Sequence, residues 1–366
     1  MEVSLKGIIF EKDKKYKIVD DVNFYMNLVD FSNINHDSIL FVNMIQAYHT
    51  EFGEFPFIEE FIETVNKIKE ERYISVIVYI LNETCVKDTT QFDTISHQTK
   101  LNYFISNYDL FFNKDIHLFY PASMCSQLEY LNDNDFESGK SFLMSMNQQY
   151  HNLQKPYKCA FYSKHINPIR IDIFNILKKY NVLKDSTWSF HKLEEYYSGE
   201  RHDLNEFYKE NEGLIPYSFD YYSDDRSNLK HTYFSQWMCY FEILTESYFL
   251  RYLDNKNDYC PMTEKIVKPI VSGLPFIIFC PKKLREGLEN IGMTFNSPLY
   301  GFYDISSDSE IELGLKHIEK QVSMPKEDLH ELYFEYIEEY HRNLEMFLSF
   351  FKQNSEKIKG CLQNID

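Results

Sequence analysis

The first 150 residues alternate apolar runs with helical patterns. Residues 38–46 form a strand-like apolar run, and residues 56–71 carry apolar side chains at helical spacing after Pro56. The next run, residues 73–81, is rich in β-branched side chains and almost wholly apolar, which is typical of a strand buried on both faces of a parallel sheet. Further elements are expected as a helix over 94–107, an apolar run at 116–120 and a strand over 141–146. This alternation predicts an α/β layer domain.

A polar turn at residues 152–156 marks the expected boundary between two domains. Beyond it, a strand is predicted over 157–163 and a helix over 170–180. The alternation resumes with a strand-like run at 238–244, and a further helix is predicted over 283–291. Residues 194–228 are acidic, rich in tyrosine and poor in aliphatic side chains, so we expect an irregular insertion there. A long amphipathic helix is predicted over 326–352. The predicted domains are therefore 1–153 and 154–325, followed by a helical segment over 326–366.

One segment, residues 263–279 (TEKIVKPIVSGLPFIIF), combines a short helix with a buried strand. Thr263 and Glu264 open the helix, and Gly273 stands where a left-handed cap is expected. Unpaired N–H groups and the helix dipole attract phosphate at a helix start, where Lys265 would add a positive charge. The alternative is an ordinary helix–strand unit whose Glu264 and Lys265 side chains are solvated.

The charge balance argues against nucleic-acid binding as the main function. The 366 residues include 56 acidic and 38 basic side chains, for a net charge of −18, which repels polyanions unless basic residues cluster on one face. Clusters do occur at residues 178–179 and 282–285. The sequence therefore argues against a dedicated nucleic-acid-binding protein, but not against an enzyme that touches nucleic acid briefly.

The cysteines and the apolar runs indicate where the protein works. The seven cysteines are scattered and never stand in C-x-x-C spacing, which indicates free thiols in a reducing compartment and no zinc site. Apolar stretches are far shorter than the roughly 20 residues of a membrane-spanning helix. We therefore expect a soluble cytoplasmic protein without a membrane span.

Common catalytic motifs are absent or incomplete. Residues 138–141 (SGKS) end like a phosphate-binding loop, but Asn134 replaces the glycine that lets such a loop curl around a phosphate. An enzyme that binds ATP at residues 139–141 is kept as an alternative. Asp133 and Asp135 have a D-x-D form that either shares a divalent cation or makes a solvated turn. No G-x-S-x-G, H-E-x-x-H or G-x-G-x-x-G pattern occurs, which argues against an α/β hydrolase, a zinc protease and a dinucleotide oxidoreductase.

Two stretches resemble a known enzyme family. Residues 241–247 (FEILTES) and 258–265 (DYCPMTEK) are similar to the donor-binding region of α1,3-fucosyltransferases, where a strand ending in Glu-Asn or Glu-Ser precedes Asp-Tyr and a Thr-Glu-Lys helix start. Residues 263–279 look even more like glycosyltransferase-like proteins of large bacteriophages, which carry a T-E-K-x-x-K-P-I-x-x-G-x-P-F-I segment. The resemblance covers residues 155–350 and departs from the fucosyltransferase spacing at residues 248–257.

The resemblance implies the GT-B fold, in which two Rossmann-like α/β domains face a cleft and a long C-terminal helix packs back toward the first. The second domain would bind the donor and the first would face the acceptor. Lys265, its helix start and Arg170 would hold a diphosphate, while Glu246 and Glu264 would bind sugar or ribose hydroxyl groups. The implied donor-binding residues are Arg170, Glu246, Ser247, Thr263, Glu264, Lys265 and Lys268. Neither a metal nor a bound cofactor is implied, because the helix and the cations neutralise the diphosphate.

The implied activity is transfer of a hexose or pentose from a nucleotide-diphosphate sugar, in the host cytoplasm if a phage encodes the protein. An inverting transfer also needs a general base from the first domain, and the candidates are His49, Glu51 and Glu83. The acceptors considered are a hydroxymethylated base of phage DNA, a protein and a glycan. The alternative is a non-catalytic binding protein or virion-associated protein that keeps the fold.

Overall fold

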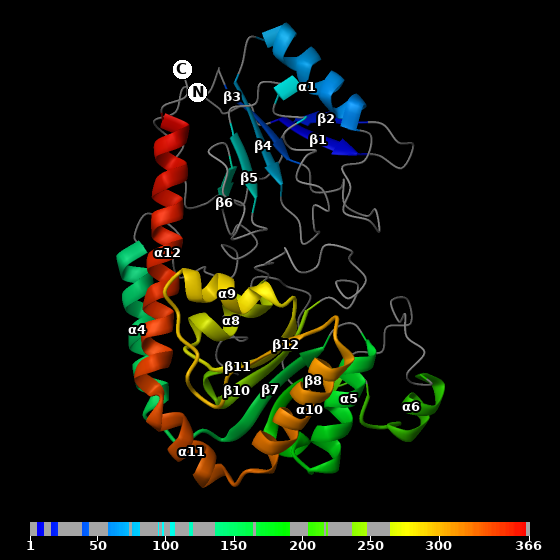
Figure 1. Ribbon diagram of the computed structural model, residues 1–366, viewed down its shortest axis with the longest axis vertical. Helices are drawn as coiled ribbons and strands as arrows, with labels where there is room; N and C mark the ends of the chain where they lie inside the picture. Colours follow the sequence, from blue (N-terminus) through cyan, green and yellow to red (C-terminus); the bar gives the residue numbers. More distant parts are fainter. Residues whose placement is uncertain are drawn as a thin grey trace. The chain divides into compact units, whose positions relative to one another are not determined.

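The structure is a computed structural model with a mixed α/β fold (Figure 1). It describes residues 6–10, 16–20, 39–43, 58–72, 75–80, 94, 97–98, 103–106, 117–119, 136–163, 166–190, 204–215, 217–218, 236–246 and 264–363. The chain separates into two compact units. Unit 1 comprises Met1–Gly139, Leu253–Glu264 and Leu348–Asp366, and unit 2 comprises Lys140–Tyr252 and Lys265–Phe347. The predicted acceptor and donor domains, and a cleft between them, stay predictions.

Unit 1 contains a four-stranded parallel sheet in the order β3-β4-β5-β6. Its elements are β3 (Ile39–Asn43), α1 (Ile58–Arg72), β4 (Ser75–Ile80), β5 (Tyr103–Ser106) and β6 (His117–Phe119). A separate antiparallel pair joins β1 (Lys6–Phe10) to β2 (Tyr16–Asp20). The strands predicted over 38–46 and 73–81, and the helix predicted over 56–71, are confirmed within a few residues.

One predicted helix of unit 1 is wrong at its C-terminal end. Residues 103–106, expected within a helix over 94–107, form β5 instead. Their sequence, YFIS, combines aromatic and β-branched side chains, which fit a pleated sheet better than a helix. Pairing with both β4 and β6 then gives this strand a place inside the sheet.

Unit 2 contains a six-stranded sheet in the order β12-β11-β10-β7-β8-β9. The parallel strands are β7 (Tyr157–Ser163), β8 (Ser186–Phe190), β10 (Cys239–Thr245), β11 (Phe276–Cys280) and β12 (Gly301–Asp304), and β9 (Tyr217–Ser218) pairs antiparallel with β8. Every residue of β8, β10 and β11 is buried, as expected for strands covered on both faces. The strands predicted over 157–163 and 238–244 are confirmed.

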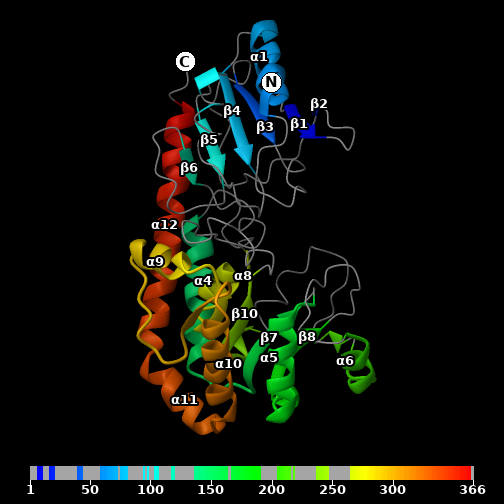
Figure 2. The ribbon, with the colours of Figure 1, turned by 45° about the vertical axis from the view of Figure 1, so that its right-hand side comes forward.

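Helices cover both faces of this sheet (Figures 1 and 2). On one face α5 (Pro168–Lys179) contacts α10 (Asp308–Ser323), and on the other lie α8 (Glu264–Val271) and α9 (Lys283–Asn290). The chain leaves β7 toward β8 but leaves β10 toward β11, in the opposite direction. Because such crossovers are right-handed, α5 and α8 fall on opposite faces. The short elements η3 (Leu183–Asp185) and α6 (Leu204–Glu210) precede and follow β8 in the chain.

The strand predicted over 141–146 is wrong, because these residues lie within α4 (Phe136–His151). Gly139, Leu143, Asn147 and His151 are all buried, and their spacing of four residues marks one face of a helix. The prediction used only the short apolar run and missed this longer period. Residues 139–141 are likewise inside α4, three residues after its start, so they do not form the ATP-binding loop that was kept as an alternative.

The helix predicted over 326–352 is two helices. Helix α11 (Lys326–Glu335) ends at Tyr336, and α12 (Ile337–Gln363) begins directly after it. Tyr336 has φ −110° and ψ 13°, outside the helical region. Tyr333 and Tyr340, on either side of the break, are fully buried with ring centroids 5.0 Å apart. The break between the helices therefore lets aromatic side chains from α11 and α12 pack into the same core.

Candidate functional site

The strand order of unit 2 reverses between β7 and β10. From β7 the chain proceeds to β8 on one side, and from β10 it proceeds to β11 and β12 on the other. Ligands of open α/β sheets bind beyond the carboxyl ends of the two strands at such a reversal. The residues at the ends of these two strands, and in the first turns of α5 and α8, are therefore the candidates for a ligand site.

Arg170 reaches this point from the first turn of α5. The side chain of Asn167 caps the helix by accepting a hydrogen bond of 2.9 Å from the backbone N–H of Arg170. The guanidinium donates from Nε to Thr245 Oγ1 at 2.5 Å and from Nη2 to the Thr245 carbonyl at 3.2 Å. Arg170 is only 6% exposed, so water screens its charge weakly.

Lys265 and Glu246 form an ion pair on the opposite face of the sheet from Arg170. Nζ of Lys265 lies 3.2 Å from Oε2 of Glu246. Lys265 is the second residue of α8, and Glu246 continues the ladder of β10 by donating its N–H to the carbonyl of Phe279 at 2.9 Å. The Glu246 side chain is fully buried, whereas that of Lys265 is 23% exposed. The pair thus has a buried negative end and a positive end that solvent reaches.

The two contacts share one strand end. Successive residues of a strand point to opposite faces, so Thr245 meets Arg170 on the α5 face while Glu246 meets Lys265 on the α8 face. We refer to these four residues as the strand-edge cluster. Two cations and two helix starts at one sheet edge suit a multiply charged anion such as a diphosphate. Thr245 had no role in the sequence prediction, and no local pattern marks it as a contact of Arg170.

Lys268 lies one turn further along α8, where its charge acts on Glu242 in the middle of β10. Burial raises the pKa of Glu242 to about 8, and the Lys268 charge opposes part of that rise. Glu242 Oε2 accepts a hydrogen bond of 2.6 Å from Gln236, whose own oxygen accepts one of 3.1 Å from Ser272. Lys268 therefore faces a different carboxylate from the one that pairs with Lys265. A contact between Lys268 and a donor stays a prediction.

Gly273 ends α8 in the left-handed cap that the sequence predicts. Its φ is +57°, which favours glycine, and a Cβ there would lie 2.6 Å from His151 Cε1 and 2.9 Å from Asn147 Oδ1. His151 Nδ1 in turn lies 2.6 Å from His341 Nε2 of α12. The turn after α8 is thus packed directly against α4, and α4 against α12.

Burial lowers the pKa of two histidines in this region, His151 and His341. Burial first, and then the charges of Lys155 and His341, hold the pKa of His151 well below its usual range. Burial also lowers the pKa of His341. It lowers the pKa of Lys155 to about 7, and Lys155 Nζ donates to the Trp237 carbonyl at 2.7 Å. A hydrogen bond between the two histidine nitrogens needs one donor and one acceptor, so full protonation of both rings removes it.

Helix α12 also anchors the loop between α9 and β12. The carboxylate of Glu339 accepts hydrogen bonds from the N–H groups of Asn296 (2.6 Å) and Ser297 (3.1 Å). Asn343 accepts from the N–H of Thr294 at 2.9 Å and donates to the carbonyl of the same residue at 2.7 Å. The sequence prediction missed this role. The signal was the presence of Glu339 and Asn343 four residues apart on the apolar face of an amphipathic helix, where both are buried.

Several predicted site residues lie outside the described part of the chain: His49, Glu51, Glu83, Ser247 and Thr263. The D-x-D pair at residues 133–135 is also outside it. Glu264 is the first residue of α8, but the description does not extend to its side chain. The three candidate general bases and the roles of Ser247, Thr263 and Glu264 therefore stay predictions.

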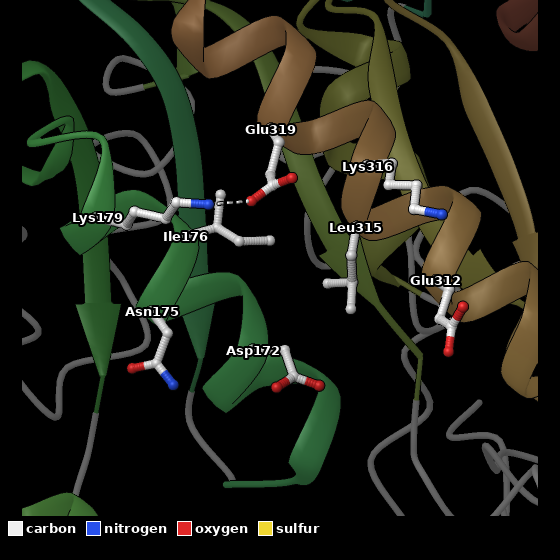
Figure 3. A pocket seen from close by; sticks show the side chains of 8 residues that line it. All are labelled: Asp172, Asn175, Ile176, Lys179, Glu312, Leu315, Lys316 and Glu319. Carbon is white, nitrogen blue, oxygen red and sulfur yellow. Dashed lines mark hydrogen bonds and ion pairs between the residues drawn. The ribbon is translucent and has the colours of Figure 1, made fainter.

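A groove of about 360 Å³ runs between α5 and α10. Figure 3 shows charged and polar side chains from both helices along it, and the ion pair between Lys179 and Glu319, of 2.9 Å, spans it. The lining residues are Asp172, Asn175, Ile176, Lys179, Glu312, Leu315, Lys316 and Glu319. The groove shares α5 with the strand-edge cluster but none of its residues, so the two features are distinct.

Other ligand types find less support in the described residues. Among them, no three side chains of His, Cys, Asp or Glu are grouped so that they could hold a metal ion. Cys159, Cys239 and Cys280 are buried and form no disulfide with one another. Within the same part of the chain, no helix combines the length and apolar character that crossing a membrane requires.

Comparison with known proteins finds similar solved structures but no matching protein family. Neither a protein-family model nor a curated protein sequence matches this chain. Similar solved structures include three crystal structures described as an α1,3-fucosyltransferase, an α1,3-fucosyltransferase with GDP and an α1,3-fucosyltransferase with GDP-fucose. Their identities are 12%, 13% and 12%, their TM-scores are 0.38, 0.39 and 0.37, and they cover 94%, 94% and 91% of this chain and 96% of each other chain. Likeness at this level assigns no activity to this chain.

Proposed function

We propose that this protein is a glycosyltransferase that uses a nucleotide-diphosphate sugar as donor. One observation carries the proposal: Arg170 and Lys265, from helices on opposite faces of the sheet, meet the same strand end where the strand order reverses. A diphosphate is multiply charged and can accept hydrogen bonds from both cations and from both helix starts. The resemblance of residues 241–247 and 258–265 to the donor region of α1,3-fucosyltransferases supports the same assignment.

In this proposal the cations stabilise the leaving group. Negative charge builds on the diphosphate as its bond to the sugar breaks, and fixed positive charges stabilise that charge most in the transition state. Arg170 would bind two oxygens with its planar fork, whereas Lys265 would act as a mobile point charge. Glu246 would accept hydrogen bonds from sugar or ribose hydroxyl groups. The protein cations would neutralise the diphosphate, so the proposal includes no metal.

The acceptor side of the reaction is proposed from the sequence. We propose an inverting transfer in the cytoplasm, with His49, Glu51 or Glu83 as the general base that activates the acceptor hydroxyl. The proposed acceptors are a hydroxymethylated base of phage DNA, a protein or a glycan. The formal charge of −18 opposes DNA as acceptor unless a basic surface compensates for it.

A thermal-shift screen tests the donor class. The purified protein is heated with UDP-, GDP-, ADP- and CMP-sugars. A ligand that binds the native state raises the unfolding midpoint, and the rise grows with the logarithm of the ratio of ligand concentration to Kd. We expect stabilisation by one nucleotide class and loss of that stabilisation in Lys265→Ala. If no nucleotide or nucleotide sugar stabilises the protein, the donor assignment is wrong.

Donor hydrolysis separates an enzyme from a binding protein that keeps the fold. Many transferases transfer their sugar slowly to water, so the stabilising nucleotide sugar is incubated with the protein without an acceptor. Release of free sugar that disappears in Lys265→Ala supports the enzyme. Tight binding without any release, even with hydroxymethylated DNA, protein and glycan acceptors present, supports the non-catalytic alternative.

A further inference from the structure

We infer that Thr245 is a positioning residue that aims the Arg170 guanidinium at the donor phosphates. The inference rests on the proposed function for what Arg170 binds, and on the structure for what holds Arg170. Thr245 is the last residue of β10, and Arg170 is the third residue of α5. The two residues are 75 positions apart in the sequence and meet at the reversal of strand order.

The contact fixes one edge of the guanidinium. Thr245 uses two oxygens, its hydroxyl for Nε and its backbone carbonyl for Nη2, so the planar group is held at two points. Two hydrogen bonds along one edge define the plane of the group, which a single bond does not. Binding a phosphate with the guanidinium fork requires that plane to be set, because both donated bonds have to reach oxygens of one group.

Backbone geometry places both residues before any ligand arrives. Asn167 caps α5 by accepting from the N–H of Arg170, which fixes the helix start from which the side chain leaves. Thr245 is 4% exposed and Arg170 is 6% exposed, so the hydrogen bonds between them form in surroundings with little competing water. The hydroxyl of Thr245 therefore contributes pre-organisation, which lowers the entropy cost of binding.

The discriminating variants are Thr245→Val and Thr245→Ser. Valine keeps the β-branched shape of threonine but has no hydroxyl to accept from Nε of Arg170, whereas serine keeps the hydroxyl. Thr187→Val is the matched control, because Thr187 is a fully buried threonine of β8, two strands away from β10 in the same sheet. Its hydroxyl accepts from Tyr162 and contacts Cys239 Sγ, and neither contact involves Arg170. Circular dichroism and thermal unfolding establish that each variant is folded.

Nucleoside diphosphate binding measures the functional consequence. UDP, GDP and ADP are titrated calorimetrically into each protein, and the one that binds the wild type most tightly is the probe. We expect Thr245→Val to weaken binding about tenfold, the size of one lost hydrogen bond, and Thr245→Ser and Thr187→Val to stay within about twofold of the wild type. Equal binding by Thr245→Val and the wild type would overturn the inference.

A double-mutant cycle separates positioning from general damage. If Thr245 acts only through Arg170, Thr245→Val has no further effect on the dissociation constant in an Arg170→Lys background. Lysine keeps the charge and removes the fork. If the two substitutions instead add in full, Thr245 acts independently of Arg170 and the positioning role is wrong.

A ligand-free measurement keeps this inference distinct from the proposed function. In protein labelled with ¹⁵N-arginine, the Nε–H signal of Arg170 is assigned by its loss in Arg170→Lys. We expect slow hydrogen exchange of this signal in the wild type and in Thr245→Ser, and fast exchange in Thr245→Val. Slow exchange together with no nucleotide binding would overturn the proposed function but support the contact. Fast exchange in the wild type would overturn the contact itself.

Discussion

The ammonium of Lys265 lies 3.2 Å from Oε2 of Glu246, and the two ends of this pair differ in exposure, at 23% for Lys265 and 0% for Glu246. A ligand that approaches from solvent therefore meets the positive end first. The buried carboxylate keeps the ammonium at the sheet edge without blocking its exposed side. The pair is consequently both a structural contact and a means of presenting a positive charge.

Substituting Lys265 by alanine should affect stability and binding together. The buried Glu246 loses its cationic partner, which should cost about 1–3 kcal/mol of unfolding free energy, less than a fully buried pair because Lys265 is partly exposed. The midpoint rise caused by nucleotide sugars should also disappear. Lys179→Ala is the control, since it breaks the exposed Lys179–Glu319 pair and should leave both measurements nearly unchanged. Retained nucleotide binding in Lys265→Ala would contradict the role of Lys265.

Gly273→Ala should destabilise the protein more than Gly213→Ala does. Both glycines have positive φ, at +57° and +86°, so alanine costs backbone strain at either position. At Gly273 the new Cβ would also meet His151 Cε1 at 2.6 Å, whereas at Gly213 nothing lies within 4 Å. Urea unfolding should show a loss of about 1 kcal/mol for Gly213→Ala and about 2–4 kcal/mol for Gly273→Ala. Equal losses would mean that the turn after α8 moves away from α4 without cost.

Acid should destabilise the protein through His151 and His341. Burial lowers the pKa of both side chains, so the unfolded state binds more protons than the native state below about pH 6.5. The stability that the two neutral histidines contribute is fully present above about pH 6.5 and is lost as the pH falls below that value. The charged neighbours act in both directions, because Lys155 lowers the pKa of His151 while Glu338 and Glu345 raise that of His341.

Urea unfolding between pH 5 and pH 8 measures this effect. His341→Gln is the informative variant, since glutamine can donate to Nδ1 of His151 but does not titrate. It should flatten the dependence of unfolding free energy on pH below about 6.5. A profile as steep as that of the wild type would show that other groups cause the acid sensitivity.

The Glu242 carboxyl should change the unfolding free energy with pH in the opposite sense to the two histidines, and Glu242→Gln should remove this effect. Burial raises the Glu242 pKa from 4.5 to about 8, so between these values the native state keeps a proton that the unfolded state has lost. The stability contributed by the protonated carboxyl is therefore present below pH 4.5 and is lost as the pH rises through about 8. Glutamine removes this loss, so Glu242→Gln should gain stability over the wild type as the pH rises, on the order of 4–5 kcal/mol at pH 8 and above. A constant difference between the two proteins from pH 4.5 to pH 8 would contradict a raised pKa.

The sequence predicted the elements whose patterns are long or unambiguous. The β-branched run at 73–81 and the segment 263–279, with its glycine cap and apolar strand, both appear where expected. The errors came from short apolar runs. Residues 103–106 and 141–146 are each compatible with helix or strand, and only pairing with β4 or burial along one face of α4 decides between them.

The candidate site was predictable one residue at a time, but not as a set of contacts. Lys265 at a helix start and Arg170 at another are visible as types and positions in the sequence. Their meeting at β10 depends on the strand order, which follows from packing of the whole sheet and not from local pattern. Thr245 shows the difference most clearly, because a threonine at a strand end has no special meaning until the Arg170 side chain is seen to contact it.

The adjacency of Thr245 and Glu246 makes the register of β10 a determinant of charge placement. Deleting or inserting one residue within this strand would turn each side chain to the opposite face. A deletion would place Glu246 opposite Arg170, whose charge it would neutralise, and an insertion would place Thr245 opposite Lys265. In both cases Lys265 would lose its counter-ion. One-residue insertions and deletions are therefore expected to be tolerated outside β10 far better than within it.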